Sequence, residues 1–356
     1  DENDQPQLVK VETYVAKNMT NVSLSYNDTE TWATQVSNES DVDEVGELWY
    51  DKISGKLVYM TTHFSTFVLG ANEVAYIEET NMAYSIEDAF TNVNSGQTIT
   101  LLKNYKYASS PSYVYSQRTV YKIDLNGYIL DMNNSSYGLY VLKGQTVTIN
   151  DSNGTGALKN KQCVVYMVDG SNLIVNGGYL GGVTADQATI YGYGHLTVNG
   201  GKVDVAKKSG YDFYGVFVGN SSNNNTPASF ILTGGEVNGG IYINGQDTEN
   251  NTITITGGVM NGKSYVAGNN KTVITGGTFA GTTCFCFKSG DISISGGTFT
   301  ANKGDGDWKH MDSAFAATGD AVIFEACSYP TGNLAAHITG GTFSGFKAEG
   351  GTAETS

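Results

Sequence analysis

A short phrase that recurs through most of the chain constrains its fold more than any other feature. The phrase has the pattern apolar, polar, apolar, polar, Gly-Gly, as in LIVNGG, ITITGG and ISISGG, and IDLNGY and VTINDS fit it with a glycine missing or replaced. The first corner residues are Gly127, Asp151, Gly177, Gly200, Gly234, Gly257, Gly276, Gly296 and Gly340, so successive corners lie 24, 26, 23, 34, 23, 19, 20 and 44 residues apart. A period of about 20–26 residues with occasional expansions is typical of a solenoid.

The residues around each corner indicate which kind of solenoid to expect. The positions two and four residues before the corner are apolar in every repeat except at Thr272, and the position immediately before it is Asn, Thr or Ser. Three residues after the corner the chain is apolar again, except at Gly154. An alternation of period two with one apolar face predicts a β-strand, and the Gly pair predicts a bend where a residue without Cβ can adopt a positive φ.

A further strand-like segment precedes each phrase, so each repeat is expected to hold three strands. These segments are YGLYVLKG, CVVYMVDG, ATIYGYG, YGVFVG, GIYING, SYVAGN and CFCFKSG. Stacking such repeats in register predicts an all-β fold, a right-handed parallel β-helix of about ten coils, because parallel crossover connections are right-handed by default. The Asn, Thr and Ser positions before the corners are expected to form an outward polar column.

The chain is predicted to contain two domains, residues 1–75 and 76–356. In the first, segments 9–16, 22–26, 47–51, 56–63 and 65–70 indicate strands of a small β-sandwich-like domain, and the polar segment between the second and third indicates loops. In the second, residues 84–94 predict an amphipathic capping helix with Ser85 as its N-cap. Nothing after Phe343 resembles a cap, so we expect either further coils in a longer protein or a partner over that end.

Composition excludes several classes of protein. The net charge of −15 disfavours nucleic acid and anionic membranes as partners, and no apolar run is long enough to span a bilayer. The four Cys contain no CxxC pair, and Cys284 and Cys286, two apart on one strand, are poorly placed to bond each other. We therefore expect no metal site and no disulfide framework.

The segment from Ser85 to Leu158 resembles the start of many secreted or cell-surface parallel β-helix domains of Gram-positive gut bacteria, which share the pectate-lyase-like fold. The matching phrases are SIEDAF, GQTITLLKN, IDLNGYIL and QTVTINDSNGTGAL, and the ITGGTF repeats belong to the same group, so the resemblance covers residues 85–345. It implies this fold and an extracellular location, whether secreted or at the cell surface. It implies no particular activity, because one fold hosts many functions.

Enzymes of this fold suggest two chemistries to look for. Its polysaccharide lyases resemble one another in needing acidic residues that hold Ca²⁺ and an Arg or Lys base, and here Asp124 and Asp151 lie on neighbouring repeats while Arg118 is the single Arg. The same two aspartates also fit ordinary turn chemistry. Its glycoside hydrolases are similar in bringing several Asp together, but this chain has no Asp-Asp pair.

Two expanded loops carry the candidate ligand-binding residues. The loop 301–318 combines aromatic and acidic groups, and the loop 105–117 is rich in Tyr; rings beside polar groups suit sugars, although surface loops and packing explain them too. The candidate residues are Trp308, Asp305, Asp307, His310, Asp312, Tyr105, Tyr107, Tyr113 and Tyr115.

The sequence thus favours a non-enzymatic extracellular β-helix module, an adhesive or spacer that binds glycans or surface polysaccharide. We assign no catalytic residue and no cofactor. The alternative is a polysaccharide-active lyase or glycoside hydrolase of the β-helix class, for which Ca²⁺ would be the expected cofactor.

Overall fold

The computed structural model describes residues 8–26, 30–61, 67–70, 73–185, 187–205, 207–208, 211–212, 214–219, 226–244, 250–302, 319–325 and 333–345. Within these residues the chain forms 36 strands, one α-helix and two short 3₁₀ helices, so the fold is all-β, as predicted. It divides into two compact units, residues 1–104 and 105–356, whereas the sequence analysis placed the boundary after residue 75. Among the residues described, no helix has the length and apolar character needed to cross a membrane.

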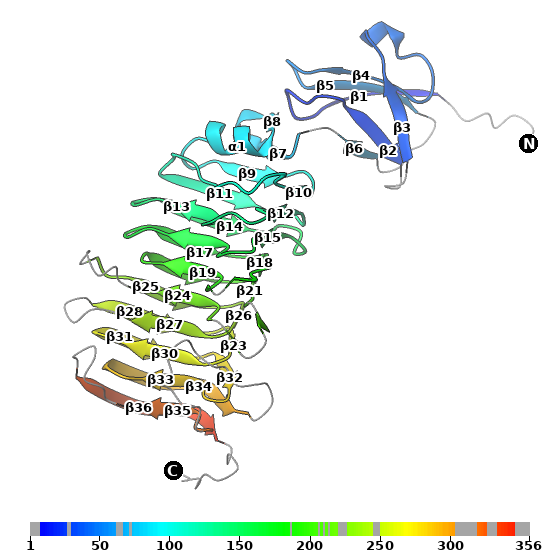
Figure 1. Ribbon diagram of the computed structural model, residues 1–356. Coiled ribbons are helices and arrows are strands. Elements are labelled where there is room, and N and C mark those ends of the chain that lie inside the picture. The colour runs from blue at the N-terminus through cyan, green and yellow to red at the C-terminus, as the bar shows by residue number, and fades with distance from the viewer. Residues whose placement is uncertain are drawn as a thin grey trace, which may run out of the picture. The chain divides into compact units, whose positions relative to one another are not determined.

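Six strands of the first unit form one mixed sheet in the order β1-β5-β4-β3-β2-β6 (Figure 1). Their bounds are β1 (Val9–Tyr14), β2 (Ser23–Tyr26), β3 (Glu30–Gln35), β4 (Glu47–Asp51), β5 (Lys56–Thr61) and β6 (Phe67–Gly70). Neighbours run antiparallel except β3 and β4, which are parallel. The assignment of the polar segment containing β3 to loops was wrong, because tertiary packing outweighs its weak strand propensity: Ala33 is buried in the core.

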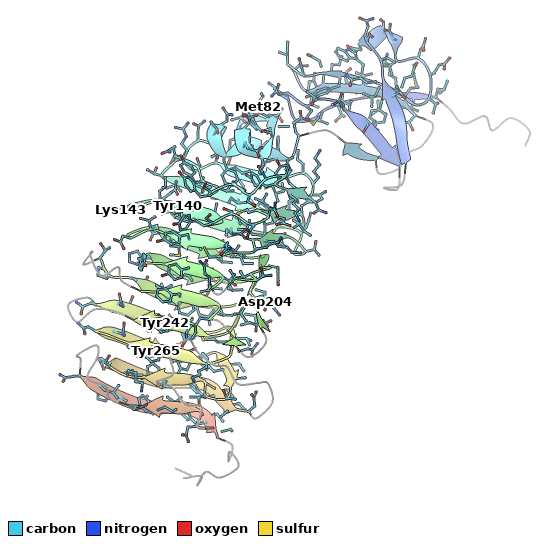
Figure 2. The ribbon with its side chains drawn as sticks, in the orientation of Figure 1. Met82, Tyr140, Lys143, Asp204, Tyr242 and Tyr265 are labelled. Carbon is cyan, nitrogen blue, oxygen red and sulfur yellow. The ribbon has the colours of Figure 1, made fainter. Side chains whose placement is uncertain are left out.

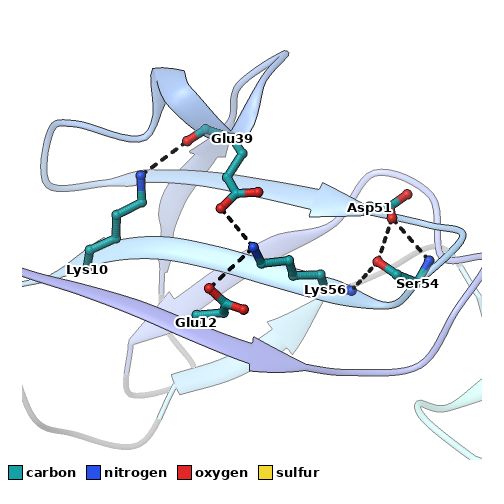
Figure 3. A network of polar contacts seen from close by, with 6 residues as sticks. All are labelled: Lys10, Glu12, Glu39, Asp51, Ser54 and Lys56. Atoms are coloured by element: carbon teal, nitrogen blue, oxygen red, sulfur yellow. Dashed lines mark hydrogen bonds and ion pairs between the residues drawn. The ribbon is translucent and has the colours of Figure 1, made fainter.

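The core of this sheet is small, and polar contacts supplement it. Met19, Leu48 and Leu57 pack with Tyr50, whose hydroxyl donates to the Ala16 carbonyl (2.5 Å) and accepts from the Met19 N–H (3.2 Å). At the surface, the Lys56 Nζ of β5 lies 3.3 Å from a Glu12 carboxylate oxygen on β1 and 2.8 Å from a Glu39 carboxylate oxygen on the 3₁₀ helix η1 (Glu39–Asp41) (Figure 3). The polar contacts therefore join β1, β5 and η1.

The rest of the first unit contains the predicted helix. The helix α1 (Ile86–Asn92) begins after Ser85, whose Oγ accepts from the Asp88 N–H at 3.1 Å, so the predicted N-cap is confirmed. Around it lie β7 (Ala75–Ile77), the 3₁₀ helix η2 (Glu78–Thr80), β8 (Met82–Tyr84) and β9 (Thr98–Leu101), and β7 pairs antiparallel with β8 and β9. That the helix α1 caps the stacked repeats stays a prediction.

The strands of the second unit line up in three parallel ladders, each gaining one strand per sequence repeat (Figure 1). The first ladder contains β11 (Val120–Asp124), β14 (Thr146–Asn150), β17 (Asn172–Val175), β20 (His195–Val198), β25 (Ser229–Leu232), β28 (Asn251–Ile255) and β31 (Asn270–Ile274), followed by the first halves of β34 (Gly290–Ala301) and β36 (Leu334–Ser344). The second contains β10 (Tyr105–Lys106), β12 (Ile129–Asp131), β15 (Ala157–Lys159), β18 (Tyr179–Gly181), β21 (Lys202–Val203), β26 (Glu236–Asn238), β29 (Val259–Asn261) and β32 (Thr278–Gly281), followed by the second halves of β34 and β36.

The third ladder is made by the strands that precede each phrase. It contains β13 (Leu139–Val141), β16 (Val165–Met167), β19 (Ile190–Gly192), β24 (Val216–Val218), β27 (Ile241–Asn244), β30 (Ser264–Ala267), β33 (Phe285–Phe287) and β35 (Val322–Phe324). A short hairpin of β22 (Lys207–Lys208) and β23 (Tyr211–Asp212) stands outside the ladders. Three strands per repeat, with parallel pairing between successive repeats, is what an all-β parallel solenoid requires.

The predicted columns are present. Ile255 and Ile294 of the first ladder are fully buried, whereas Thr254 is half-buried and Ser293 is exposed. The Gly154 break also has an explanation: Leu158, which pairs with Leu130 and Leu180, takes that column because the turn after Asp151 holds extra residues.

The corners form a polar column on the outside. The Asn176 Nδ2 donates to the Asn150 Oδ1 and the Asn199 Nδ2 to the Asn176 Oδ1, both at 2.9 Å, and the Thr233 Oγ1 donates to the Asn199 Oδ1 at 2.7 Å. The glycine that follows, Gly200, leaves no room for a Cβ, which would lie 2.3 Å from the Asn176 carbonyl oxygen. The amide column and the tight corner thus share one backbone geometry.

Candidate functional site

The most regular surface feature is a row of stacked rings along the third ladder. Each strand from β13 to β30 carries one aromatic residue in the same register, and each ring stacks on the next with centroids 4.5–5.7 Å apart and planes within 8–28°. We call this row the aromatic ladder; it consists of Tyr140, Tyr166, Tyr191, Phe217, Tyr242 and Tyr265. Tyr140, Tyr242 and Tyr265 follow one another down one side of the repeats (Figure 2).

Strand alternation places these rings on the outer side of the third ladder. On β13, Leu139 and Val141 point inward and are buried, while Tyr140 between them is half-buried. The same alternation repeats on β16 and β19. Parallel rings in contact lie about 3.5–4 Å apart, so a centroid distance of 5.1 Å between Tyr140 and Tyr166 means that they overlap only partly. Each ring therefore keeps some apolar surface that its neighbour does not cover.

Further tyrosines widen one end of the aromatic ladder. Tyr113 lies 5.4 Å from Tyr140, and Tyr137 makes edge contacts with Tyr140 and Tyr166 at 5.7 and 5.1 Å. Tyr113 and Tyr137 are exposed, at 46% and 44% of their surface. Large aromatic side chains with this much exposure are candidates for contact with a ligand, because they offer apolar area and a hydroxyl at little entropic cost.

The hydroxyls of Tyr140, Tyr166 and Tyr191 in the aromatic ladder remain neutral hydrogen-bonding groups. Burial raises the pKa of Tyr166 to about 12, with the nearby Tyr193 and Tyr140 adding to the shift. Burial likewise raises the pKa of Tyr140 and of Tyr191. These phenols thus act as donors and acceptors without charge throughout the neutral and mildly alkaline range, which suits a neutral ligand with hydroxyl groups.

The aromatic ladder stops after Tyr265. The next residue in register is Cys286, which is fully buried, and the neighbouring Lys263 and Lys288 on the same side are 3% and 4% exposed. Burial lowers the pKa of Lys263 to about 8, and Lys288 forms an ion pair with Glu325 at 2.5 Å. The row of accessible rings therefore has one open end, near Tyr113, and one end where the outer side is covered.

The sequence-predicted tyrosines fall into two separate pairs. Tyr105 and Tyr107 contact each other edge to face, with centroids 5.2 Å apart, beside the second ladder, and Tyr107 is buried. Tyr113 and Tyr115 form a second edge contact, also at 5.2 Å, and Tyr113 joins the aromatic ladder. The other predicted residues, Trp308, Asp305, Asp307, His310 and Asp312, lie outside the described residues, so that site stays a prediction.

The aspartates named for a lyase site are engaged by the backbone. The Asp151 Oδ1 accepts from the Gly127 N–H at 2.8 Å and its Oδ2 from the Gly156 N–H at 2.7 Å. The Asp124 Oδ1 accepts from the N–H groups of Asn126 and Ser152, both at 2.9 Å. These contacts are the turn chemistry that the sequence offered as the other explanation. Arg118 is exposed.

Two further carboxyl groups among the described residues, those of Asp204 and Asp169, have shifted pKa values. Burial raises the pKa of Asp204, but hydrogen bonds from Asn238, the Val205 N–H and Tyr179 outweigh it, and the net pKa is lowered. Asp169 has a pKa raised by burial, yet glycoside hydrolysis needs two carboxyls with opposed roles. In the described part of the chain, no group of three or more His, Cys, Asp or Glu is placed to hold a metal ion. Cys163, Cys284 and Cys286 are buried free thiols.

Sequence reasoning missed the aromatic ladder, although its signal is in the printed sequence. The sequence analysis placed the candidate tyrosines on the expanded loop 105–117, whereas the aromatic ladder lies on the strands before each phrase. Aligning YGLYV, CVVYM, ATIYG, YGVFV, GIYIN and SYVAG on their alternation places one aromatic residue in the same column of all six. A search of protein-family models, of curated proteins and of solved structures found no match to this chain.

Proposed function

We propose that this chain is a non-enzymatic extracellular or cell-surface module, a right-handed parallel β-helix that binds glycans along its aromatic ladder. The observation that carries the proposal is the unbroken row of six half-buried rings on successive strands, five of them tyrosines that bear a hydroxyl. A spacer alone would not need one aromatic residue in each repeat at an outward position.

The β-helix assignment rests on the way the ladders advance. Each repeat contributes one strand to each of three parallel ladders, and the inward residues of all three are buried from β11 to β34. Coiling of the backbone is the simplest path that joins three such ladders with short connections. Right-handed coiling follows from the preference of parallel crossovers. The resemblance of residues 85–345 to secreted β-helix domains supports both this fold and an extracellular location.

The chemistry of the aromatic ladder fits a neutral, extended polysaccharide. Sugar rings offer apolar C–H surface and hydroxyl groups, which match aromatic surface and phenol hydroxyls. Five strand spacings separate Tyr140 from Tyr265, on the order of 24 Å, so the row would contact several consecutive sugars. The net charge of −15 disfavours polyanionic chains. Binding would then depend on chain length, because each added sugar gains contact with another ring.

The experiment is a comparison of ring removal with hydroxyl removal. We expect the parent protein to be retarded by a linear neutral polysaccharide in affinity electrophoresis, and Tyr166→Ala with Tyr191→Ala to lose about tenfold or more in affinity, since each immobilised ring contributes of order 1 kcal/mol. Tyr166→Phe separates the contribution of the hydroxyl from that of the ring. Tyr128→Ala, a half-buried tyrosine at a corner of the first ladder, is the matched control.

The results of this experiment distinguish the aromatic ladder, the loop 301–318 and the absence of glycan binding. Equal affinity of the parent and the double variant, with circular dichroism showing both folded, would remove the aromatic ladder as the binding surface. Trp308→Ala in the same assay tests the loop predicted from the sequence: loss of affinity there alone would move the site to that loop. Absence of affinity for every neutral polysaccharide in a glycan array contradicts the proposed function itself.

A further inference from the structure

The turn that follows strand β16 holds two buried polar side chains that accept and donate no hydrogen bond within the described part of the chain. Asp169 is 4% exposed, and both oxygens of its carboxylate lack a partner. Ser171 is fully buried, and its Oγ lacks a partner too. A buried carboxylate is stable when hydrogen-bond donors, a proton or a cation replace the water that it has lost. This carboxylate therefore points to something that folding of the described residues does not supply.

A short turn in the next repeat leaves room beside these groups. The turn 168–171 has four residues between its flanking register pairs, whereas the corresponding turn, 193–194, has two. A Cβ on Gly194 would lie 2.5 Å from the Ser171 Oγ, so this hydroxyl faces the short turn at a residue without a side chain. The two polar groups thus lie where one repeat projects beyond the next.

Neighbouring repeats also enclose Asp169. In the repeat after the short turn, ten residues, 219–228, occupy the same place between the ladders. Among them, the Thr226 Cγ2 would lie 3.8 Å from a Cβ on Gly170, which is two repeats earlier. On the other side, the preceding repeat contributes the exposed Lys143, whose positive charge acts on the Asp169 carboxylate (Figure 2). The carboxylate is therefore enclosed, with a positive charge at the edge of its surroundings.

We propose that Asp169 and Ser171 bind a hard cation, and that Ca²⁺ is the ion that the site takes. A carboxylate with two unpartnered oxygens can bind Ca²⁺ in bidentate fashion, a hydroxyl oxygen suits the same ion, and water completes its shell of about six to eight oxygens. Zn²⁺ would need Cys or His ligands. Mg²⁺ fits less well, because it demands a near-ideal octahedron and gives up its water reluctantly.

The sequence gave no sign of this site, since an Asp and a Ser in a turn are ordinary residues and the room beside them depends on the lengths of three successive turns. One carboxylate among the ligands makes the affinity modest, with a Kd of about 0.1–1 mM, the range of extracellular calcium modules. The site is independent of glycan binding, so its test does not depend on the aromatic ladder.

The primary test is the thermal stability of the 356-residue chain in calcium chloride. We expect the melting temperature to rise across about 0.1–10 mM calcium, because the ion binds the folded state, and to rise less in magnesium chloride. Asp169→Asn keeps the size of the side chain and should abolish the rise. Asp291→Asn, an exposed carboxyl on the first ladder, is the matched control and should leave it unchanged. A parent that does not respond to calcium, or an equal response in Asp169→Asn or in magnesium, overturns the proposal.

A second variant leaves both proposed ligands in place, so it does not depend on whether Asp169→Asn folds. Lys143→Met removes the positive charge beside the carboxylate and should strengthen calcium binding by about threefold or more. Displacement of terbium, whose emission is sensitised by tyrosine, measures the calcium affinity directly. Lys122→Met, an exposed lysine on the first ladder, is the matched control and should match the parent. Equal calcium affinity in the two lysine variants would place the bound ion away from Asp169 and overturn the assignment.

Discussion

The rings of Tyr140 and Tyr166 lie with centroids 5.1 Å apart and planes within 8° of parallel, on strands that are neighbours in space and 26 residues apart in sequence. Their backbones pair in register, so the ring separation follows the spacing between adjacent strands of about 4.8 Å. Every parallel register pair on this ladder therefore places outward side chains in contact. Because successive strands pair in register, one aromatic residue in each repeat is enough to form a continuous aromatic surface.

We predict that the Tyr140–Tyr166 contact is energetically coupled. A double-mutant cycle with Tyr140→Ala and Tyr166→Ala should give an interaction free energy of about 0.5–1.5 kcal/mol, the range for aromatic pairs beyond their area burial. Chemical denaturation measures it. The cycle of Tyr166 with Tyr128, which is not in the aromatic ladder, should give a value near zero. A coupling no larger than that control would mean that the stack contributes only burial.

We predict that the inward column of the first ladder carries much of the stability of the second unit. Ile294 is fully buried, and its truncation to Ala should lower the free energy of unfolding by about 2–5 kcal/mol through lost transfer energy and a residual cavity. Ser293→Ala, next to it and exposed, should change stability by less than about 0.5 kcal/mol. Similar effects of the two substitutions would show that the register of this strand is wrong.

Thr272 should be a site where substitution stabilises the protein. It is 1% exposed, its Oγ1 has no hydrogen-bond partner, and its register partners Ile253 and Ile292 are apolar. Folding removes the Thr272 hydroxyl from water without giving it a hydrogen bond in return. Thr272→Val removes this hydroxyl, so we expect the free energy of unfolding to rise by about 1 kcal/mol. Thr254→Val, on the half-buried outer side of β28, is the control and should be close to neutral. A loss of stability in Thr272→Val would indicate that its hydroxyl is satisfied in solution.

We predict a loss of stability at alkaline pH. Burial raises the pKa of Tyr166 and of Tyr179 to about 12, with a hydrogen bond to Asp204 adding to the shift at Tyr179. Because the folded pKa lies above the unfolded value of about 10, this contribution is fully present below pH 10 and is lost as the pH rises towards 12. Melting temperatures should be flat from about pH 8 to 9 and fall above about pH 10.

A variant tests the assignment of that alkaline effect. Tyr166→Phe removes one of the shifted groups, so its unfolding free energy should decline less between about pH 10 and 12 than that of the parent. Tyr128→Phe serves as the control. A decline that is identical in the parent and in Tyr166→Phe would place the alkaline sensitivity elsewhere in the chain.

Much of the architecture could be predicted from the sequence because the repeat is local. The alternation before each corner, the small polar residue at the corner and the Gly pair depend on backbone sterics and on one buried face, which a few neighbouring residues determine. The burial of Ile255 and Ile294, the Asn150–Asn176–Asn199 column and the cap at Ser85 were all predictable for that reason. Where the sequence analysis was wrong, at β3, packing of Ala33 against residues distant in sequence outweighed a polar composition.

Tertiary structure alone decided which side chains share a surface. Whether Tyr140, Tyr166 and Tyr191 touch depends on strand register between repeats of 26 and 25 residues, and irregular turns change that register without changing the strand pattern. The same holds for the separation of Tyr107 from Tyr113, which are six residues apart but lie beside different ladders. Sequence periodicity specifies which face of a strand is buried, because that is set within the strand. The composition of the outer surface is set by pairing between strands, and only the folded chain defines it.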